Sequence, residues 1–236
     1  MKFIKVDTYN ELSREAALVI SSQLKRKPDS VLGLATGSSP VGAYRELIKM
    51  YENGEIDFSS ARSVNLDEYV GLSPEDTQSY AYFMRTNLFD HVNIKKENTN
   101  IPNGTAEDLD AECRRYDKLV LELGGVDLQL LGIGTDGHIG FNEPDSVFSK
   151  LTHTVRLAQS TIDSNARFFE SADKVPTTAI TVGMMTIMQA RSVLLVANGP
   201  SKRDILNKAL NGPITPEIPA SILQLHPHVT VIYSEN

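Results

Sequence analysis

Long hydrophobic runs, paired cysteines and blocks of basic residues are all missing from this chain of 236 residues. No stretch stays apolar over the roughly eighteen residues that a membrane span needs. The first residues, MKFIKVDTYNELSRE, contain no apolar signal core. A single cysteine, Cys113, excludes an internal disulfide framework and fits a reducing compartment. We therefore expect a cytoplasmic protein that has no membrane partner.

The charge is acidic, with 30 aspartates and glutamates against 23 lysines and arginines and a formal net charge of −7. The basic residues are scattered along the chain, which disfavours nucleic acid as a partner. An anionic small molecule remains compatible with this charge. A few cations and backbone N–H groups that converge locally suffice to bind one.

Short β-rich runs alternate with amphipathic stretches along the whole chain. Strands are predicted at 2–6, 31–35, 62–66, 126–131, 151–157, 178–182, 192–197 and 229–233. Helices are predicted at 9–26 after a Thr8 cap, 40–51, 78–92, 105–123, 160–170, 183–190 and 200–210. Runs such as VLGLA are apolar without alternation, as in a parallel sheet covered on both faces. We predict one α/β domain over 1–236, an open, Rossmann-like, doubly wound and mostly parallel sheet with helices on both faces.

Ligands of such sheets bind outside the carboxyl ends of the strands. The loops that follow residues 35, 66, 131 and 197 should therefore meet in one crevice. They begin with TGSSP, DEYVG, GIGTDGHIGFNEP and NGPSKR.

The first of these loops, residues 36–39, presents small polar residues at the start of a helix, where an anion is favoured. The alternative is that Ser39 only caps the helix before Pro40. Lys202 lies near a second helix start, where it opposes the helix dipole unless an anion sits between them. A solvated surface lysine is the other interpretation. A nucleotide P-loop is not indicated, because GxxxxGK[ST] is missing.

The central loop spells GxGxxG at Gly132, Gly134 and Gly137, but it neither opens a helix nor is followed by an acidic residue about twenty positions later. Dinucleotide binding is therefore disfavoured. His138 can accept and return protons near neutral pH, and Asp136 and Glu143 could fix its tautomer. Without these two acids it would be an ordinary surface histidine. A metal site is disfavoured, because no second histidine lies at ligand spacing.

Asp67 ends another strand, where it could serve as a base or as a helix cap. Its residue type and position leave both uses open.

Five segments together resemble the glucosamine-6-phosphate deaminase family, also called glucosamine-6-phosphate isomerase. They are ATGSSPVGAYREL (35–47), NLDEYVGL (65–72), GIGTDGHIGFNEP (132–144), ARFF (166–169) and SILQLHP (221–227). The resemblance covers nearly the whole chain. Its GHIGFNEP block is specific, because related 6-phosphogluconolactonases share the Gly-His pair but typically continue differently.

The resemblance implies conversion of D-glucosamine 6-phosphate and water to D-fructose 6-phosphate and ammonia, without a metal or organic cofactor. It implies that His138 opens the sugar ring with Asp136 and Glu143 as relay partners, and that Asp67 moves the C2 proton. It also assigns the 6-phosphate to Thr36, Gly37, Ser38, Ser39, Arg167 and Lys202.

Two rivals remain at this point: a 6-phosphogluconolactonase and a non-catalytic sugar-phosphate sensor. Glu143 within HIGFNEP favours the deaminase over the lactonase. A sensor is disfavoured because no basic helix-turn-helix segment precedes VLGLATG. Segment 145–170 is a candidate lid because its PDSVFSK stretch is polar. The oligomeric state cannot be read from the sequence.

Overall fold

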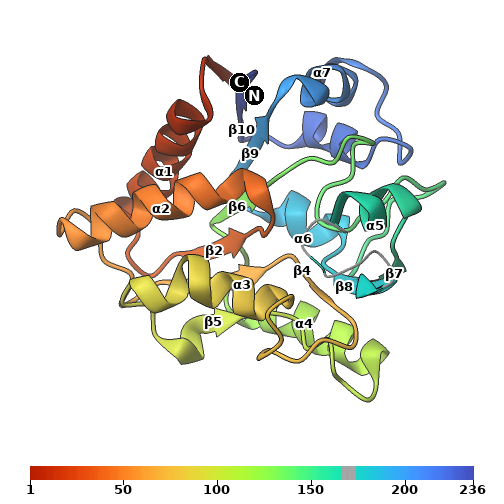
Figure 1. The fold of residues 1–236 in the computed structure, drawn as a ribbon, viewed down its shortest axis with the longest axis horizontal. Coiled ribbons are helices and arrows are strands. Elements are labelled where there is room, and N and C mark those ends of the chain that lie inside the picture. Colours follow the sequence, from red (N-terminus) through yellow and green to blue (C-terminus); the bar gives the residue numbers. More distant parts are fainter. Residues whose placement is uncertain (166–168, 170–173) are drawn as a thin grey trace.

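A seven-stranded parallel sheet forms the centre of the protein (Figure 1). The structure is a computed structural model that describes residues 1–165, 169 and 174–236. The strand order is β1-β10-β9-β6-β2-β3-β5. The strands are β1 (Lys2–Val6), β2 (Val31–Leu34), β3 (Arg62–Asn65), β5 (Thr99–Asn100), β6 (Leu128–Leu131), β9 (Val193–Asn198) and β10 (Val229–Ser234).

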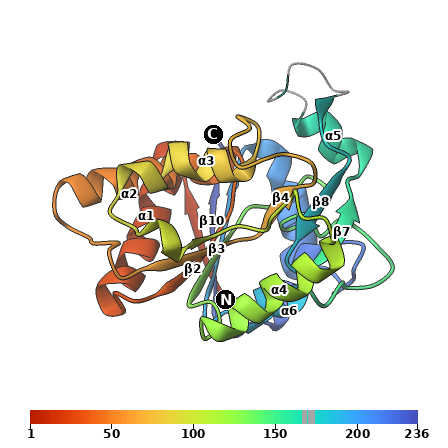
Figure 2. The ribbon, with the colours of Figure 1, turned by 90° about the horizontal axis from the view of Figure 1, so that it is seen from below.

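Helices cover both faces of this sheet, as predicted. Figure 2 shows α1 and α2 on one side of the strands and α4 and α6 on the other. The α-helices are α1 (Tyr9–Arg26), α2 (Ser38–Glu52), α3 (Tyr80–Asn87), α4 (Leu109–Glu122), α5 (Gln159–Asn165), α6 (Met184–Gln189) and α7 (Arg203–Asn211). Short 3-10 helices span Phe89–His91, Lys96–Asn98, Pro200–Lys202 and Pro219–Leu225.

The first and fourth helices have the ends that their local sequences predict. Thr8 and Glu11 form a capping box, in which each side chain accepts a hydrogen bond from the other residue's backbone N–H. Gly124 and Gly125 follow α4 with φ angles of 85° and 80°, a backbone conformation that favours glycine.

A second, three-stranded antiparallel sheet was not anticipated by the sequence analysis. Its order is β4-β8-β7, with β4 at Asp67–Tyr69, β8 at Thr178–Thr181 and β7 at His153–Arg156. The predicted strands at 151–157 and 178–182 belong to this sheet instead of the parallel one. Asp67 pairs with Thr181 in its register. The second sheet therefore gives the strand of Asp67 its own hydrogen-bonded support.

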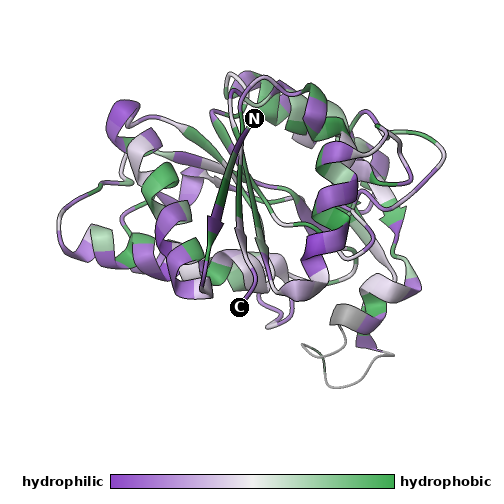
Figure 3. Ribbon diagram, turned by 90° about the horizontal axis from the view of Figure 1, so that it is seen from above, coloured by the Kyte–Doolittle hydropathy of each residue, from purple (hydrophilic) through white to green (hydrophobic). Residues whose placement is uncertain are grey.

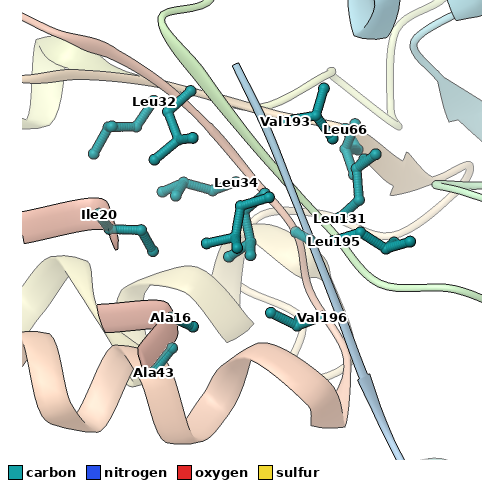
Figure 4. Close-up of a cluster of buried hydrophobic side chains, with 14 of the residues drawn as sticks. Ala16, Ile20, Leu32, Leu34, Ala43, Leu66, Leu131, Val193, Leu195 and Val196 are labelled. Atoms are coloured by element: carbon teal, nitrogen blue, oxygen red, sulfur yellow. The ribbon is translucent and has the colours of Figure 1, made fainter. Parts of the chain in front are cut away.

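The main core lies between the parallel sheet and its helices. Figure 4 shows Ala16, Ile20 and Ala43 of α1 and α2 near Leu34 of β2 and Val196 of β9, and all five side chains are buried. Hydrophobic residues occupy the central strands in Figure 3, whereas the helices also carry hydrophilic residues. Among the helices of the described residues, none is both long and apolar enough to span a bilayer.

The strand order places four loops at one edge of the sheet. Strands β9, β6, β2 and β3 are consecutive neighbours, and their pairs are parallel, so their carboxyl ends meet. The chain leaves β2 toward β3 on one side and continues later through β6 on the other. This reversal is the switch point at which doubly wound sheets bind ligands.

Candidate active site

A cavity of about 980 Å³ opens at this edge of the sheet. Its walls include the 36–39 loop, Asp67, the 132–136 loop with His138, and the β9 loop with Lys202. The four loops predicted to converge therefore share one cavity. Helix α5 adds Ser160, Thr161 and Asp163 to the wall.

The loop after β2 leads directly into α2. Gly37 is the N-cap residue with a φ of 89°, and it makes no side-chain cap hydrogen bond. The helix begins at Ser38, so the alternative in which Ser39 caps it is wrong. Thr36 to Ser39 all face the cavity. A helix N-terminus that carries no side-chain cap suits an anion, because its dipole and N–H groups favour negative charge.

Tyr9 supports this loop from the first turn of α1, and the sequence analysis missed it. Its hydroxyl donates to the carbonyl oxygens of Ser38 at 2.9 Å and Ser39 at 3.2 Å, and accepts from the Gly42 N–H at 2.8 Å. Gly42 permits the close approach of α1, since a Cβ there would lie 1.9 Å from Ser13 Oγ and 3.0 Å from Cε1 of the Tyr9 ring. Tyr9 precedes the loop by about thirty residues, so no local sequence pattern indicates this contact.

Asp67 is a buried carboxylic acid on the cavity wall, with 5% of its surface exposed. Burial, aided by the nearby charge of Glu68, raises the pKa of Asp67 to about 8, although the Phe141 N–H opposes the shift. A carboxylate with a raised pKa holds protons more strongly than an ordinary aspartate. It has the chemistry of a general base or acid near neutral pH.

The His138 ring faces two carboxylates. Its Nδ1 lies 2.7 Å from Asp136 Oδ1 and 3.6 Å from Glu143 Oε2. Burial alone would raise the pKa of Asp136, but the interactions with His138 outweigh it and lower the pKa to about 2. An acid that stays ionised beside Nδ1 favours a proton on that nitrogen and leaves Nε2 for exchange with a ligand.

Glu143 lies behind the histidine and not on the cavity wall. Its Oε1 accepts hydrogen bonds from Thr161 Oγ1 at 2.7 Å and from the Ala158 N–H at 3.3 Å. These contacts hold its other oxygen near His138. Ligand atoms of Asp136, His138 and Glu143 lie within 4.8 Å of one another, so the trio could also accept a metal ion.

The glycines of the central loop have different roles. A Cβ at Gly134 would lie 2.2 Å from the His138 ring and 2.6 Å from Asp136 Oδ1. Gly137 has a φ of 95°. Gly132 has an ordinary φ and open space where a Cβ would be. Two of the three glycines therefore shape the histidine site, and the loop does not open a helix.

The residues that follow His138 connect it to Asp67. Gly140 has a φ of 59°, and a Cβ there would lie 3.3 Å from Asp67 Oδ2. Phe141 packs its ring 5.5 Å from that of Tyr69. Asn142 donates to the carbonyl oxygens of Ile139 and Val182 at 3.0 and 2.9 Å. The GFN stretch thus fixes the histidine loop against the strand of Asp67.

Of the two cationic residues predicted to bind the phosphate, only Lys202 lies within the described residues. Lys202 lies on the same cavity wall as Ser38, in agreement with their predicted convergence. Arg167 lies outside the described residues. Tyr80, which the sequence analysis did not single out, also lines the cavity, and its hydroxyl lies 3.4 Å from that of Tyr69.

The fold and the cavity define a Rossmann-like α/β protein with titratable side chains and an anion-compatible helix start at the sheet edge. The sequence model of the glucosamine-6-phosphate isomerases/6-phosphogluconolactonase matches residues 5–232. The chain belongs to this family.

Within this family, the chain is similar in sequence to relatives and to a solved structure that are named glucosamine-6-phosphate deaminase. A glucosamine-6-phosphate deaminase of Lachnoclostridium phytofermentans is 63% identical over 98% of both chains. One from Clostridium botulinum is 54% identical, covering 98% of this chain and 95% of the relative. A solved structure described as a monomeric glucosamine-6-phosphate deaminase superposes with a TM-score of 0.97 at 48% identity, over 99% and 97% of the chains.

The lactonase side of the family is more distant among these comparisons. A 6-phosphogluconolactonase of Thermotoga maritima superposes with a TM-score of 0.79 over 100% of this chain and 99% of its own, but at 17% identity. This similarity concerns the fold alone.

Proposed function

We propose that this protein is a glucosamine-6-phosphate deaminase, which converts D-glucosamine 6-phosphate and water to D-fructose 6-phosphate and ammonia. The observation that carries the proposal is the shared cavity of buried Asp67, the His138 relay and the 36–39 helix start. The relatives of that name at 48–63% identity support the same reaction.

The 6-phosphate would bind at the start of α2, against Thr36, Gly37, Ser38 and Ser39. Lys202 would supply a positive charge from the loop after β9, which lines the same cavity. Arg167 is proposed as the second cation from the ARFF motif. This clamp orients the sugar so that C1 and C2 lie toward the proton-transfer groups.

His138 is the proposed ring-opening residue. It moves a proton from the anomeric hydroxyl to the ring oxygen, which converts the pyranose to the open-chain aldehyde. Asp136 stabilises the charged imidazole from 2.7 Å, and Glu143 supports it from behind. Asp136 would thus orient His138 in the way that the acid of a catalytic triad orients its histidine.

Asp67 is the proposed base for isomerisation. It takes the C2 proton of the aldehyde to give a cis-enolamine, and returns a proton to C1. The resulting C2 imine takes up water and releases ammonia, which leaves the C2 ketone of fructose 6-phosphate. The C2 ammonium of the bound substrate acidifies the C–H bond, and as a nearby cation it favours the ionised form of Asp67. No metal or organic cofactor takes part in this scheme.

The two rivals differ in what they would release. A lactonase hydrolyses an ester and releases no ammonia, and the similarity to lactonases at 17–21% identity concerns only the fold. A sensor would bind sugar phosphates without turnover. The Asp67 and His138 pair on one cavity wall favours catalysis over sensing.

The test is an assay of the purified protein with glucosamine 6-phosphate in the presence of a chelator. Ammonia and fructose 6-phosphate should appear in equal amounts. If neither is formed, the proposal fails, and hydrolysis of 6-phosphogluconolactone and ligand binding become the next measurements. Activity that appears only when metal is restored would overturn the metal-free scheme.

A further inference from the structure

Glu68 is a buried carboxylate beside Asp67 that the proposed reaction does not use. It is 2% exposed and does not line the cavity. Among the described residues, the hydrogen-bond donors to its carboxylate are backbone N–H groups, and it forms no ion pair with a lysine, arginine or histidine. A buried carboxylate without a cationic partner is costly, so its other contacts require an explanation.

Three backbone N–H groups bind this carboxylate. Oε1 accepts from Tyr69 and Tyr80 at 2.9 Å each, and Oε2 accepts from Ala81 at 2.9 Å. Tyr80 and Ala81 are the first two residues of α3, whose dipole also favours a negative charge at this end. These dipoles stabilise the ionised form and leave its negative charge in place, whereas a salt bridge would cancel it.

The two acids point to opposite sides of one strand. Asp67 and Glu68 are successive residues of β4, so Asp67 faces the cavity while Glu68 faces α3. A Cβ at Gly104 would lie 3.3 Å from Glu68 Cγ, which shows how closely the chain covers the glutamate. Charges this close in a poorly solvated region interact strongly.

Other titratable groups also lie near this pair. Asp76 adds a second negative charge near Glu68. Tyr80 and Tyr116 also face Asp67, but burial raises the pKa of each phenol well above its usual value, so both are neutral. Burial raises the pKa of Glu68, but the N–H groups of Tyr69, Tyr80 and Ala81 oppose this shift. These three donors favour the ionised form of Glu68 beside Asp67.

We propose that Glu68 is a positioning residue that fixes β4 to the first turn of α3 and, through its buried negative charge, makes Asp67 a stronger proton acceptor. This inference rests on the proposed function, in which Asp67 takes the C2 proton. Tyr80, which α3 brings to the cavity wall, is placed by the same contact.

The decisive variant is Glu68→Gln, which keeps the size of the side chain and removes its charge. The acid limb of the kcat/KM profile should move to lower pH by roughly one unit, because a like charge near a buried acid raises its pKa by about that much. At pH 9, kcat should fall severalfold, because Asp67 is then a weaker base, while KM for glucosamine 6-phosphate stays the same.

Glu68→Asp separates the charge from the contacts. It keeps the charge but is one methylene too short for the three N–H groups, so it should lower Tm and kcat and leave the acid limb near its original pH. Glu75→Gln is the matched control. It also removes one carboxylate between β4 and α3, but the Glu75 side chain is 77% exposed. Its profile should not move.

The outcomes are separable. No ammonia release by the unchanged protein would overturn the proposed function. An active protein whose acid limb is unmoved in Glu68→Gln would overturn only the role of Glu68. If Glu68→Gln does not fold, a one-unit shift in the charge-conserving Glu68→Asp would overturn it as well.

Discussion

Asp67 and Asp136 are the same residue type on the same cavity, yet their surroundings shift their pKa values in opposite directions. Asp136 lies 2.7 Å from His138 Nδ1, and its pKa is lowered to about 2. Asp67 is buried beside another acid, and its pKa is raised to about 8. The permanently ionised acid suits the support of a histidine, whereas the proton-binding one suits transfer to and from carbon. Opposite shifts within one site divide acid and base roles.

The largest expected effect comes from Asp67→Asn, which removes the proton-binding member of the comparison. Turnover should fall by roughly 10³-fold or more, because the general base is lost. Exchange of the C2 proton with solvent deuterium should also stop, while sugar-phosphate binding persists. Exchange at the original rate would show that another group is the base.

The same variant should be more stable at pH 8 than the original protein. An acid with a raised pKa binds its proton more tightly in the folded state, so its contribution to stability is greatest below about pH 4 and declines as the pH rises to about 8. Asparagine has no such decline. Melting curves from pH 5 to pH 8 should show a Tm difference that grows by roughly several degrees. A constant difference would contradict the raised pKa.

His138→Gln tests the other half of the comparison. It should lower turnover of the closed-ring substrate by roughly 10²-fold, and lower turnover of the open-chain aldehyde less. Asp136 should lose its depressed pKa, because the histidine is the main cause of the lowering. His91→Gln is the matched control, as His91 lies outside the cavity wall. Equal losses on both substrate forms would refute a ring-opening role.

Gly140→Ala probes the contact between the loop that carries His138 and the side chain of Asp67. The methyl group would lie 3.3 Å from Asp67 Oδ2 on a residue with a φ of 59°. We expect a loss of about 1–2 kcal/mol in the free energy of unfolding, from the left-handed backbone. The C2 exchange rate should fall roughly tenfold, because small displacements of reacting groups are costly. An unchanged exchange rate would mean that Asp67 tolerates a side chain beside it.

The smallest effect is expected from Tyr9→Phe, which leaves both aspartates unchanged and loosens the 36–39 loop. Each lost hydrogen bond is worth about 1 kcal/mol, so KM for the sugar phosphate should rise roughly 3- to 10-fold while kcat stays constant. Tyr82→Phe serves as the control, because its hydroxyl does not face the cavity. A fall in kcat with constant KM would place Tyr9 in the chemistry instead.

Most of the parallel sheet could be predicted, because its strands are apolar on both faces and its helices carry local end signals such as Thr8. Strand β4 could not be predicted. It has three residues, and its sequence, DEY, has the polarity of a surface loop although all three are buried. Burial of such residues depends on β8, which lies more than one hundred positions later in the chain.

The site residues likewise divide into those that the sequence predicts and those that it does not. His138, Asp136 and Glu143 stand out because they are close in the sequence. Tyr9 and Glu68 carry no local pattern, since their contacts are made with α2 and α3 after folding. The residue type and position of Asp67 are compatible with both a base and a helix cap. In the structure the carboxylate at the α3 N-terminus is that of Glu68, its neighbour.

The three-stranded sheet has a consequence for how this enzyme could change. Strand β8 pairs with Asp67 through Thr181, and Thr181 Oγ1 also accepts the Phe141 N–H at 3.1 Å. Strand β7 leads into α5, whose Thr161 holds Glu143. The three-stranded sheet therefore supports Asp67, the Phe141 segment and, through α5, Glu143, whereas the 36–39 loop connects β2 of the parallel sheet to α2. Substitutions in the 36–39 loop should therefore change the cavity wall without disturbing the contacts that hold Asp67 and Glu143.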